Sequence, residues 1–395
     1  MNKIRMIKGG VCAARGFVAG STGCGIKTGR VVRDDLAVVV SEVPATAAAT
    51  FTTNKVKAAP VRISAEHMRA GRARAVVLNS GNANACTGPG GLADARAMAA
   101  ATADSLGLKP SQVLVCSTGR IGVPMPMPAI LRGITSVKTS RSGGTGAAKA
   151  IMTSDTFAKE IALEVATRDG SFRVGGMAKG AGMIDPNMAT MLCVVTTDAI
   201  VAAPALRLAL RESVEDSFNR ITIDGDMSTN DTVILLANSA SGISPSPKTF
   251  RDALDTVTRG LARMIVSDGE GVSRFVEVEV RRAASPADAR RAAEAVANST
   301  LVKCAWAGGD PNWGRILDAV GYCGAKMDEA KTDIFYDALP VAAGGVAAGT
   351  AAKFLRAVAA KKAFRVTVDL KVGKASHVVW TTDLTEEYVR LNLGE

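Results

Sequence analysis

The sequence predicts an α+β protein built from layers of sheets and helices. Short apolar runs that end in polar residues alternate with Ala-rich stretches, without the strict strand–helix–strand rhythm of a doubly wound sheet. Hydrophobic residues make up 47% and charged residues 22% of the 395 residues, as in globular proteins with a sizeable core. Because aromatic residues make up only 4%, the core must consist mainly of aliphatic side chains.

Buried strands are predicted where apolar runs end in, or are followed by, Ser, Asn, Thr or Asp. These runs are Leu36–Val40, Ala75–Leu78, Val113–Ser117, Met191–Thr197 and Val233–Ala237. Such strands place polar side chains at their ends, where a site can form. Phe275–Val280 and Phe364–Leu370 alternate apolar with charged or polar residues, which predicts strands with one solvent-exposed face.

Helices are predicted in four segments with apolar stripes: Leu92–Leu106, Pro204–Phe218, Pro286–Ala297 and Ala351–Lys361. The third has the clearest start, with Ser285 as N-cap, Pro at the first helical position and Asp288 three residues after the cap. Of the segments rich in Gly and Ser, Gly20–Gly29 predicts a tight turn and Ser140–Gly146 a flexible surface loop.

The composition argues against several classes of protein. The net charge of +11 is spread thinly and no run of five basic residues occurs, so we expect a solvated basic surface and no nucleic-acid partner. The seven cysteines are odd in number and form no CxxC pair, which favours small buried hydrophobes in a reduced, cytoplasmic protein. No apolar run reaches the ~18 residues of a membrane helix, and no signal peptide is visible, so no membrane partner is expected.

Metal sites and histidine-based catalysis are also disfavoured. The chain contains only two histidines, His67 and His377, and we expect both to be structural. We expect two polar clusters to hydrogen-bond the turns that frame a site. These clusters are Asn79/Asn82/Asn84 and Asp224/Asp226/Asn230/Asp231. The second is dense in acids, but its spacing does not match a calcium loop and it has no closing Glu, so we expect it to hold no metal.

The segment Gly175–Thr197 combines a Gly-rich loop, Pro186, the pair Ala189-Thr190 and then an apolar strand. The Thr190 hydroxyl can attack the Ala189 carbonyl in an N-to-O acyl shift, and hydrolysis of the ester would leave Thr190 as a new N-terminus. Its α-amine, with a pKa of about 7.7–8.0 in model peptides, could then serve as general base. An ordinary Gly-rich turn is the alternative, and the residues alone leave both open.

Eight segments in order resemble the ornithine acetyltransferase (glutamate N-acetyltransferase, ArgJ) family. The processing motif GGMAKGAGMIDPNMATML is one of them. The others are NSGNANAC (79–86), CSTGRIG (116–122), AIMT (150–153), DGDMSTNDT (224–232), DGEG (268–271), GDPNWGR (309–315) and DLTEEYV (383–389). The resemblance implies a layered α/β sandwich of the DmpA/ArgJ type. It also implies self-processing into an alpha chain, residues 1–189, and a beta chain, residues 190–395, which pair as an α2β2 heterotetramer.

The implied activity is transfer of an acetyl group from N2-acetylornithine to glutamate in cyclic arginine biosynthesis. No motif separates two forms of this activity. A monofunctional enzyme would only recycle acetyl groups, whereas a bifunctional one would also use acetyl-CoA, as an amino-acid N-acetyltransferase does. Acetyl-CoA would be a co-substrate, and no cofactor is expected. The alternative is a self-processing aminopeptidase-like hydrolase that passes the acyl group from Thr190 to water.

The resemblance also assigns roles to individual residues. Thr190 would be the nucleophile, after cleavage between Ala189 and Thr190. Thr118 and Gly119 would form the oxyanion hole, through a hydroxyl and a backbone N–H. The residues implied to contact substrate are Thr153, Lys179, Thr190, Glu270 and Asn392. An ammonium suits a substrate carboxylate and a carboxylate suits a substrate ammonium, which fits Lys179 and Glu270.

One segment departs from the family pattern. Family members usually continue past Asp-Leu-Thr-x-x-Tyr-Val into Asn-Ala-x-Tyr-x-Thr, whose Asn and final Thr touch the substrate. Here Asn392 is followed by Leu-Gly-Glu, and that Thr is absent. We therefore expect Asn392 to orient the substrate and one substrate contact of the family to be missing.

Overall fold

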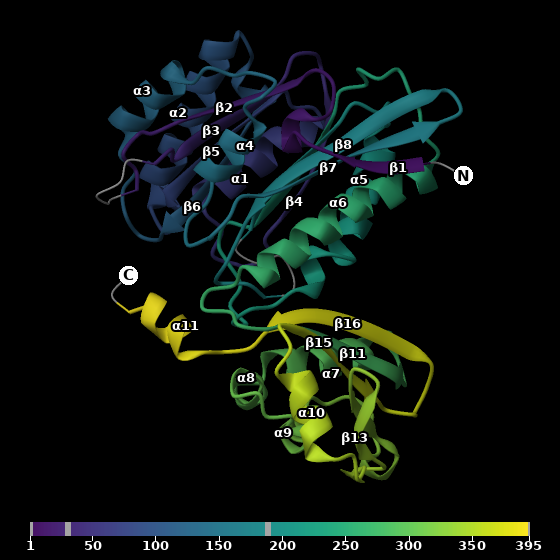
Figure 1. The fold of residues 1–395 in the computed structure, drawn as a ribbon. Coiled ribbons are helices and arrows are strands. Elements are labelled where there is room, and N and C mark those ends of the chain that lie inside the picture. The colour runs from purple at the N-terminus through teal and green to yellow at the C-terminus, as the bar shows by residue number, and fades with distance from the viewer. Residues whose placement is uncertain (1–2, 28–32, 186–190, 394–395) are drawn as a thin grey trace. The chain divides into compact units, whose positions relative to one another are not determined.

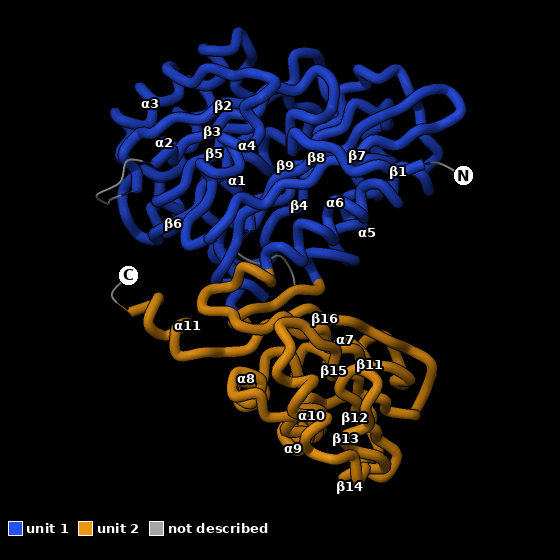
Figure 2. The backbone as a smooth tube through the Cα atoms, in the orientation of Figure 1, with its two compact units in different colours: residues 1–219, 226–265 blue, residues 220–225, 266–395 orange. Residues whose placement is uncertain are grey.

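The structure is a computed structural model that describes residues 3–27, 33–185 and 191–393. The chain forms two compact units, residues 1–219 with 226–265 and residues 220–225 with 266–395 (Figure 2). The predicted alpha and beta chains do not correspond to these two units, because the predicted cleavage after residue 189 falls inside the first unit. That cleavage bond lies outside the described residues, and the two-chain division stays a prediction.

The first unit contains a six-stranded sheet of order β1-β7-β8-β9-β10-β4 and a four-stranded sheet of order β2-β3-β5-β6. β9 runs parallel to β10 and antiparallel to β8, and β5 runs parallel to β6. The strands are β1 (Lys3–Ile7), β2 (Phe17–Thr22), β3 (Leu36–Ser41), β4 (Thr46–Phe51), β5 (Ala75–Asn82), β6 (Val113–Arg120), β7 (Lys159–Thr167), β8 (Gly170–Lys179), β9 (Leu192–Thr197) and β10 (Thr232–Ala237).

Helices cover these sheets and complete a layered sandwich (Figure 1). The helices are α1 (Ala59–His67), α2 (Gly88–Leu106), α3 (Met127–Ser136), α4 (Gly144–Ala150), α5 (Ala203–Glu215) and α6 (Pro247–Ser267). One core joins the two sheets, with Leu78 and Leu114 on one side and Val194 and Ile234 on the other. A second core lies between the four-stranded sheet and α2 and α3, where Met98 packs. The predicted layered α+β class is confirmed.

The second unit has one six-stranded sheet of order β14-β13-β12-β15-β11-β16 with helices packed against it. Its elements are β11 (Phe275–Ala283), α7 (Pro286–Asn298), α8 (Thr300–Ala307), α9 (Trp313–Tyr322), β12 (Asp333–Tyr336), β13 (Leu339–Ala343), β14 (Val346–Ala347), α10 (Ala352–Ala359), β15 (Ala363–Asp369), β16 (Ala375–Thr382) and α11 (Glu386–Leu391). As predicted, the Ser285 side chain caps α7 by accepting from the Asp288 N–H.

The predictions for two segments rich in Gly and Ser are wrong in whole or in part. Ser140–Gly146 is no flexible loop, because Ser140 pairs with Ala19 of β2 through two backbone hydrogen bonds of 3.0 and 2.8 Å and α4 begins at Gly144. A Cβ on Gly143 would lie 1.8 Å from the Ala19 carbonyl oxygen, so Gly is needed there for close packing. Part of the predicted turn at Gly20–Gly29 is also wrong, since residues 20–22 belong to β2, and residues 28–29 lie outside the described residues.

All seven cysteines are free thiols, but not all are buried. Cys116 and Cys193 are buried, as expected of small hydrophobes, whereas Cys86 and Cys304 are exposed. Burial raises the pKa of the Cys116 thiol to about 12, which makes that thiol unreactive. Within the described ranges, no helix combines the length and the apolar character that crossing a membrane requires.

Candidate active site

The end of β6 carries the two residues predicted to form an oxyanion hole. β5 and β6 are in register at this end, with Ser80 opposite Thr118 and Gly81 opposite Gly119. Gly119 has a φ of 131°, and a Cβ there would lie 2.3 Å from the carbonyl carbon of Gly81. Only glycine fits this position, so the strand end can bring its backbone close to a neighbour without a side chain in between.

Lys179 ends β8 and contacts Thr118 from the other sheet. Its Nζ donates to the Thr118 hydroxyl oxygen at 3.3 Å, and both residues are buried, 2% and 3% exposed. In the antiparallel ladder Lys179 lies opposite Leu192, two positions after Thr190 in the sequence. Thus two residues that the sequence singled out separately lie side by side, close to the start of β9.

A buried carboxylate, Asp155, organises the surroundings of Lys179. Its oxygens accept from the backbone N–H of Gly180 at 2.8 Å and of Thr153 at 2.9 Å, and from Lys159 Nζ at 2.6 Å. The side chains of Asp155 and Lys159 are fully buried. Burial alone would raise the pKa of Asp155, but the ammonium groups of Lys179 and Lys159 outweigh it and lower the pKa to about 2. Asp155 is therefore ionised at neutral pH.

A second buried carboxyl, Asp231, lies at the start of β9 and β10. Its Oδ1 accepts from the Met191 N–H at 3.0 Å, while its Oδ2 has no hydrogen-bond partner. The nearby Thr52 hydroxyl donates to the Ser228 carbonyl oxygen at 2.7 Å. Burial raises the pKa of Asp231 well above its usual range, and the Met191 N–H and the charge of Lys179 only partly oppose this. Burial therefore favours the neutral form of Asp231, next to the residue that follows Thr190.

Asparagine side chains tie the loops around these strand ends together, as predicted for the polar clusters. Asn230 donates from Nδ2 to the carbonyl oxygens of Ala83 and Ser117, at 2.6 and 2.8 Å. Asn79 accepts from the Ser117 hydroxyl and donates to the Asn82 carbonyl oxygen at 2.9 Å. These bonds hold the end of β6 against the segment before β10 and so fix the positions of Thr118 and Gly119.

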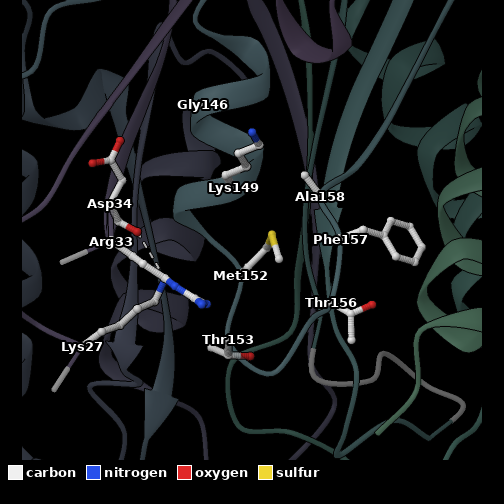
Figure 3. Close-up of a pocket in the computed structure, with 10 residues that line it drawn as sticks. All are labelled: Lys27, Arg33, Asp34, Gly146, Lys149, Met152, Thr153, Thr156, Phe157 and Ala158. Carbon is white, nitrogen blue, oxygen red and sulfur yellow. Dashed lines mark hydrogen bonds between the residues drawn. The ribbon is translucent and has the colours of Figure 1, made fainter. Parts of the chain in front are cut away.

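Thr153 borders a cavity of about 570 Å³ in the first unit (Figure 3). Its backbone is fixed by Asp155, as described above, and its side chain lies among the lining residues. The described part of the first unit thus brings together Thr118, Gly119, Lys179 and Thr153, all of which the sequence singled out. No group of three His, Cys, Asp or Glu that could hold a metal ion occurs among the described residues.

Glu270 and Asn392 meet in the second unit. The Asn392 side chain donates to Glu270 Oε2 at 2.8 Å, and Thr385 donates to the Gly271 carbonyl oxygen at 2.6 Å. Asp383 accepts from the backbone N–H of Ser273 at 2.9 Å, so the C-terminal segment is fastened to the loop that bears Glu270. Two predicted substrate contacts therefore belong to one hydrogen-bonded assembly.

The predicted nucleophile Thr190 and its neighbour Ala189 lie outside the described residues. The nearest described position after them is Met191, which is fully buried and whose carbonyl oxygen accepts from the Thr232 N–H at 3.1 Å. Cleavage and the roles of these two residues stay predictions.

Sequence reasoning missed Asp155 and Lys159 and did not single out Asp231 from its cluster. Asp155 and Lys159 are four residues apart in a segment without hydrophobic periodicity. In sequence, charged residues in such a segment look like residues of a solvated surface. The one signal was the density of polar residues directly before the strand at Val233–Ala237, which marked the neighbourhood of Asp231.

Comparison with known proteins decides the family. The family model described as "ArgJ family" matches residues 18–394. The chain is 49% identical over 375 residues to the arginine biosynthesis bifunctional protein ArgJ of Geobacter sulfurreducens, covering 93% of this chain and 95% of that protein. The protein of the same name from Symbiobacterium thermophilum is 46% identical over 398 residues, 98% of each chain. The chain belongs to the ArgJ family.

Membership in the ArgJ family confirms the family predicted from the eight segments and the predicted class of enzyme, an acetyltransferase of arginine biosynthesis. A solved relative is the ornithine acetyltransferase of Mycobacterium tuberculosis complexed with ornithine. It is 42% identical, with a TM-score of 0.43, and the match covers 48% of this chain and 100% of that chain.

Proposed function

We propose that this ArgJ-family enzyme transfers an acetyl group from N2-acetylornithine to glutamate through an acetyl ester on Thr190. The observation that carries the proposal is the buried contact between Lys179 Nζ and the Thr118 hydroxyl oxygen, 3.3 Å long. This contact brings the Lys179 ammonium and the Thr118 hydroxyl together next to Gly119 at the end of β6. All three lie close to the start of β9, the strand that follows Thr190. These are the groups that acyl transfer needs near its nucleophile.

Self-cleavage would come first. The Thr190 hydroxyl attacks the Ala189 carbonyl, the amide nitrogen leaves as the Thr190 amine, and water then hydrolyses the ester. Such a cut would leave the sheet intact, because β8 and β9 pair from Val174–Thr197 to Lys179–Leu192 and the bond lies in the connection between them. This pairing supports two fragments that stay associated. The α2β2 assembly and the cytoplasmic location stay predictions.

Acetyl transfer would follow in two half-reactions. The Thr190 hydroxyl attacks the acetyl carbonyl, its proton passes to the α-amine as base, and ornithine leaves after taking up that proton. The amine of glutamate then attacks the ester and regenerates Thr190.

The Thr118 contact suits the charge that develops in both half-reactions. Because the Thr118 oxygen accepts from Lys179, its own hydrogen remains available to the developing oxyanion. Lys179 also places a positive charge beside that hydroxyl, which stabilises negative charge forming there. Glu270, with Asn392 bonded to it, is suited to a substrate ammonium group.

Intact-mass analysis of the wild type beside Thr190→Ala tests this proposal. We expect two wild-type fragments, residues 1–189 and 190–395, and one uncut, inactive Thr190→Ala chain. Incubation with acetylornithine alone should add one acetyl mass to the fragment that begins at Thr190, and double-reciprocal plots should be parallel. A cut elsewhere or an active uncut variant would refute the mechanism, and release of acetate to water without transfer to glutamate would indicate the aminopeptidase-like alternative.

A further inference from the structure

The second unit contains a buried amine, Lys303, that the proposed mechanism does not use. Lys303 belongs to α8 and is only 3% exposed. Burial lowers the pKa of its ammonium group to about 7, although the charges of Asp383 and Asp224 oppose this. The fold therefore disfavours the charged form of Lys303, and an apolar side chain of the same length would avoid that cost. A residue that is costly to bury calls for a role other than packing.

Lys303 binds three oxygen acceptors at the end of β16. Its Nζ donates to the hydroxyl oxygens of Thr381 and Thr382, at 3.0 and 3.1 Å, and to the Thr382 carbonyl oxygen. The Thr381 hydroxyl in turn donates to the Ala297 carbonyl oxygen of α7 at 3.1 Å. The Leu384 N–H donates to the Lys303 carbonyl oxygen at 3.3 Å. Lys303 thus holds the last two residues of β16 through its side chain and the following chain through its backbone.

The chain that Lys303 holds is also bonded to the loop that bears Glu270. Asp383 accepts from the backbone N–H of Arg274 at 3.0 Å and forms an ion pair of 3.4 Å with the Arg274 guanidinium. The same guanidinium donates to the carbonyl oxygen of Ala307, the last residue of α8, at 3.0 Å. The end of β16, the helix α8 and the Glu270 loop are therefore tied together.

The pair formed by Glu270 and Asn392 depends on this connection. Asn392 follows α11, the helix that the chain forms after β16, and donates to Glu270 Oε2 at 2.8 Å. Gly271, beside Glu270, packs closely on this helix, since a Cβ there would lie 2.5 Å from the backbone nitrogen of Tyr388. Because the packing leaves little freedom, a shift of the end of β16 would also shift the Glu270 carboxylate and Asn392.

The two acetyl donors of the proposed exchange differ in the group that a carboxylate can recognise. N2-acetylornithine keeps one free ammonium group, at the end of its side chain, because its other nitrogen is acetylated. N-acetylglutamate, the donor when the exchange runs in reverse, has no ammonium group. A correctly placed Glu270 carboxylate therefore favours the first donor over the second.

We propose that Lys303 is a positioning residue for donor recognition. By fixing the end of β16, it sets the Glu270–Asn392 pair for the ammonium group of N2-acetylornithine. The inference rests on the proposed acetyl transfer and deepens it, because it adds a residue that acts only through Glu270 and Asn392. Loss of a positioning residue changes the preference between the two donors, whereas loss of a merely structural residue affects both donors alike.

The test is the ratio of the kcat/KM values for the two donors. In a reaction with a covalent intermediate, kcat/KM for a donor reports on the half-reaction of that donor alone. Lys303→Met removes the N–H donors and keeps the length of the side chain. We expect it to lower kcat/KM for N2-acetylornithine about tenfold, mainly through KM, because the carboxylate pairs less well with the substrate ammonium. The value for N-acetylglutamate should stay unchanged. Lys374→Met is the matched control, since this exposed Lys directly precedes β16 at its other end, and it should leave both values unchanged.

A second variant decides the question if Lys303→Met does not fold. Thr382→Val keeps the shape of the side chain and removes one hydroxyl acceptor of Lys303. It should change the donor ratio in the same direction by about threefold, since one hydrogen bond is lost. Equal changes for both donors, or an unchanged ratio in the folded variants, would overturn this inference and leave the proposed function standing. Absence of exchange in the wild type would refute the proposed function and, with it, the inference that rests on it.

Discussion

Replacing Asp155 by Asn should destabilise the first unit strongly. The carboxylate lies 2.6 Å from Lys159 Nζ, and both side chains are fully buried. Asn keeps an acceptor for a backbone N–H but removes the negative charge, so the buried Lys159 ammonium loses its ion pair with Asp155. Breaking a buried pair in this way typically costs about 3–5 kcal/mol of the free energy of unfolding.

Acid sensitivity gives the same substitution a second readout. The folded pKa of Asp155, about 2, lies below the ordinary value of 3.8, so its stabilisation is fully present above pH 3.8 and is lost as pH falls toward 2. The difference between the two values corresponds to about 2 kcal/mol. We expect Asp155→Asn to lack this share of the loss of stability between about pH 4 and 2.

The assay is urea denaturation followed by circular dichroism, in the Thr190→Ala background so that one chain unfolds. Asp252→Asn is the control, since its partner Lys248 is 84% exposed and surface pairs contribute about 0–1 kcal/mol. Adding Lys159→Met to Asp155→Asn should recover much of the loss, because the buried Lys159 charge is then removed together with its partner. The reasoning fails if Asp155→Asn costs no more than Asp252→Asn and shows the same acid profile as its parent.

Three further outcomes are expected. Gly119→Ala should lower kcat by a factor of about 10²–10³, because its Cβ would meet the Gly81 backbone and shift an oxyanion donor. Gly90→Ala is the control, since a Cβ there meets nothing within 4 Å, and it should leave kcat unchanged in the same assay. Thr190→Ser should still cleave, since Ser keeps the hydroxyl, and one band on electrophoresis would contradict this. Asn392→Ala should raise KM for acetylornithine by about tenfold with a smaller change in kcat, as expected when a binding hydrogen bond is lost, and equal falls in kcat and kcat/KM would contradict it.

The fold was predictable where a local pattern decides the structure. The runs at Leu36–Val40 and Val233–Ala237 became β3 and β10 because uninterrupted apolar residues suit a strand buried on both faces. The start of α7 followed from Ser285, whose hydroxyl oxygen can accept from the N–H three residues later. Such signals need only neighbouring residues.

What depends on contacts between distant segments was not predictable. Asp155 and Lys179 are far apart in sequence, and only the packing of the loop before β7 against the end of β8 gives them one environment. The same reason explains the wrong prediction for Ser140–Gly146, since Ser and Gly indicate a mobile loop until the pairing with Ala19 is known. The place of Thr118 and Gly119 at the end of a strand was predictable, because the apolar run before them is clear in the sequence, whereas their role came from the family resemblance and stays a prediction.

The two carboxyl groups near Lys179 are both buried, but their pKa values move in opposite directions. Asp155 also faces the ammonium groups of Lys159 and Lys179, which outweigh its burial and lower its pKa, whereas Asp231 has one oxygen without a hydrogen-bond partner and its pKa is raised. Burial of both thus leaves one carboxyl group charged and favours the neutral form of the other, because their charged neighbours differ. The Lys179 ammonium lies beside the Thr118 hydroxyl, where acyl transfer would develop a negative charge.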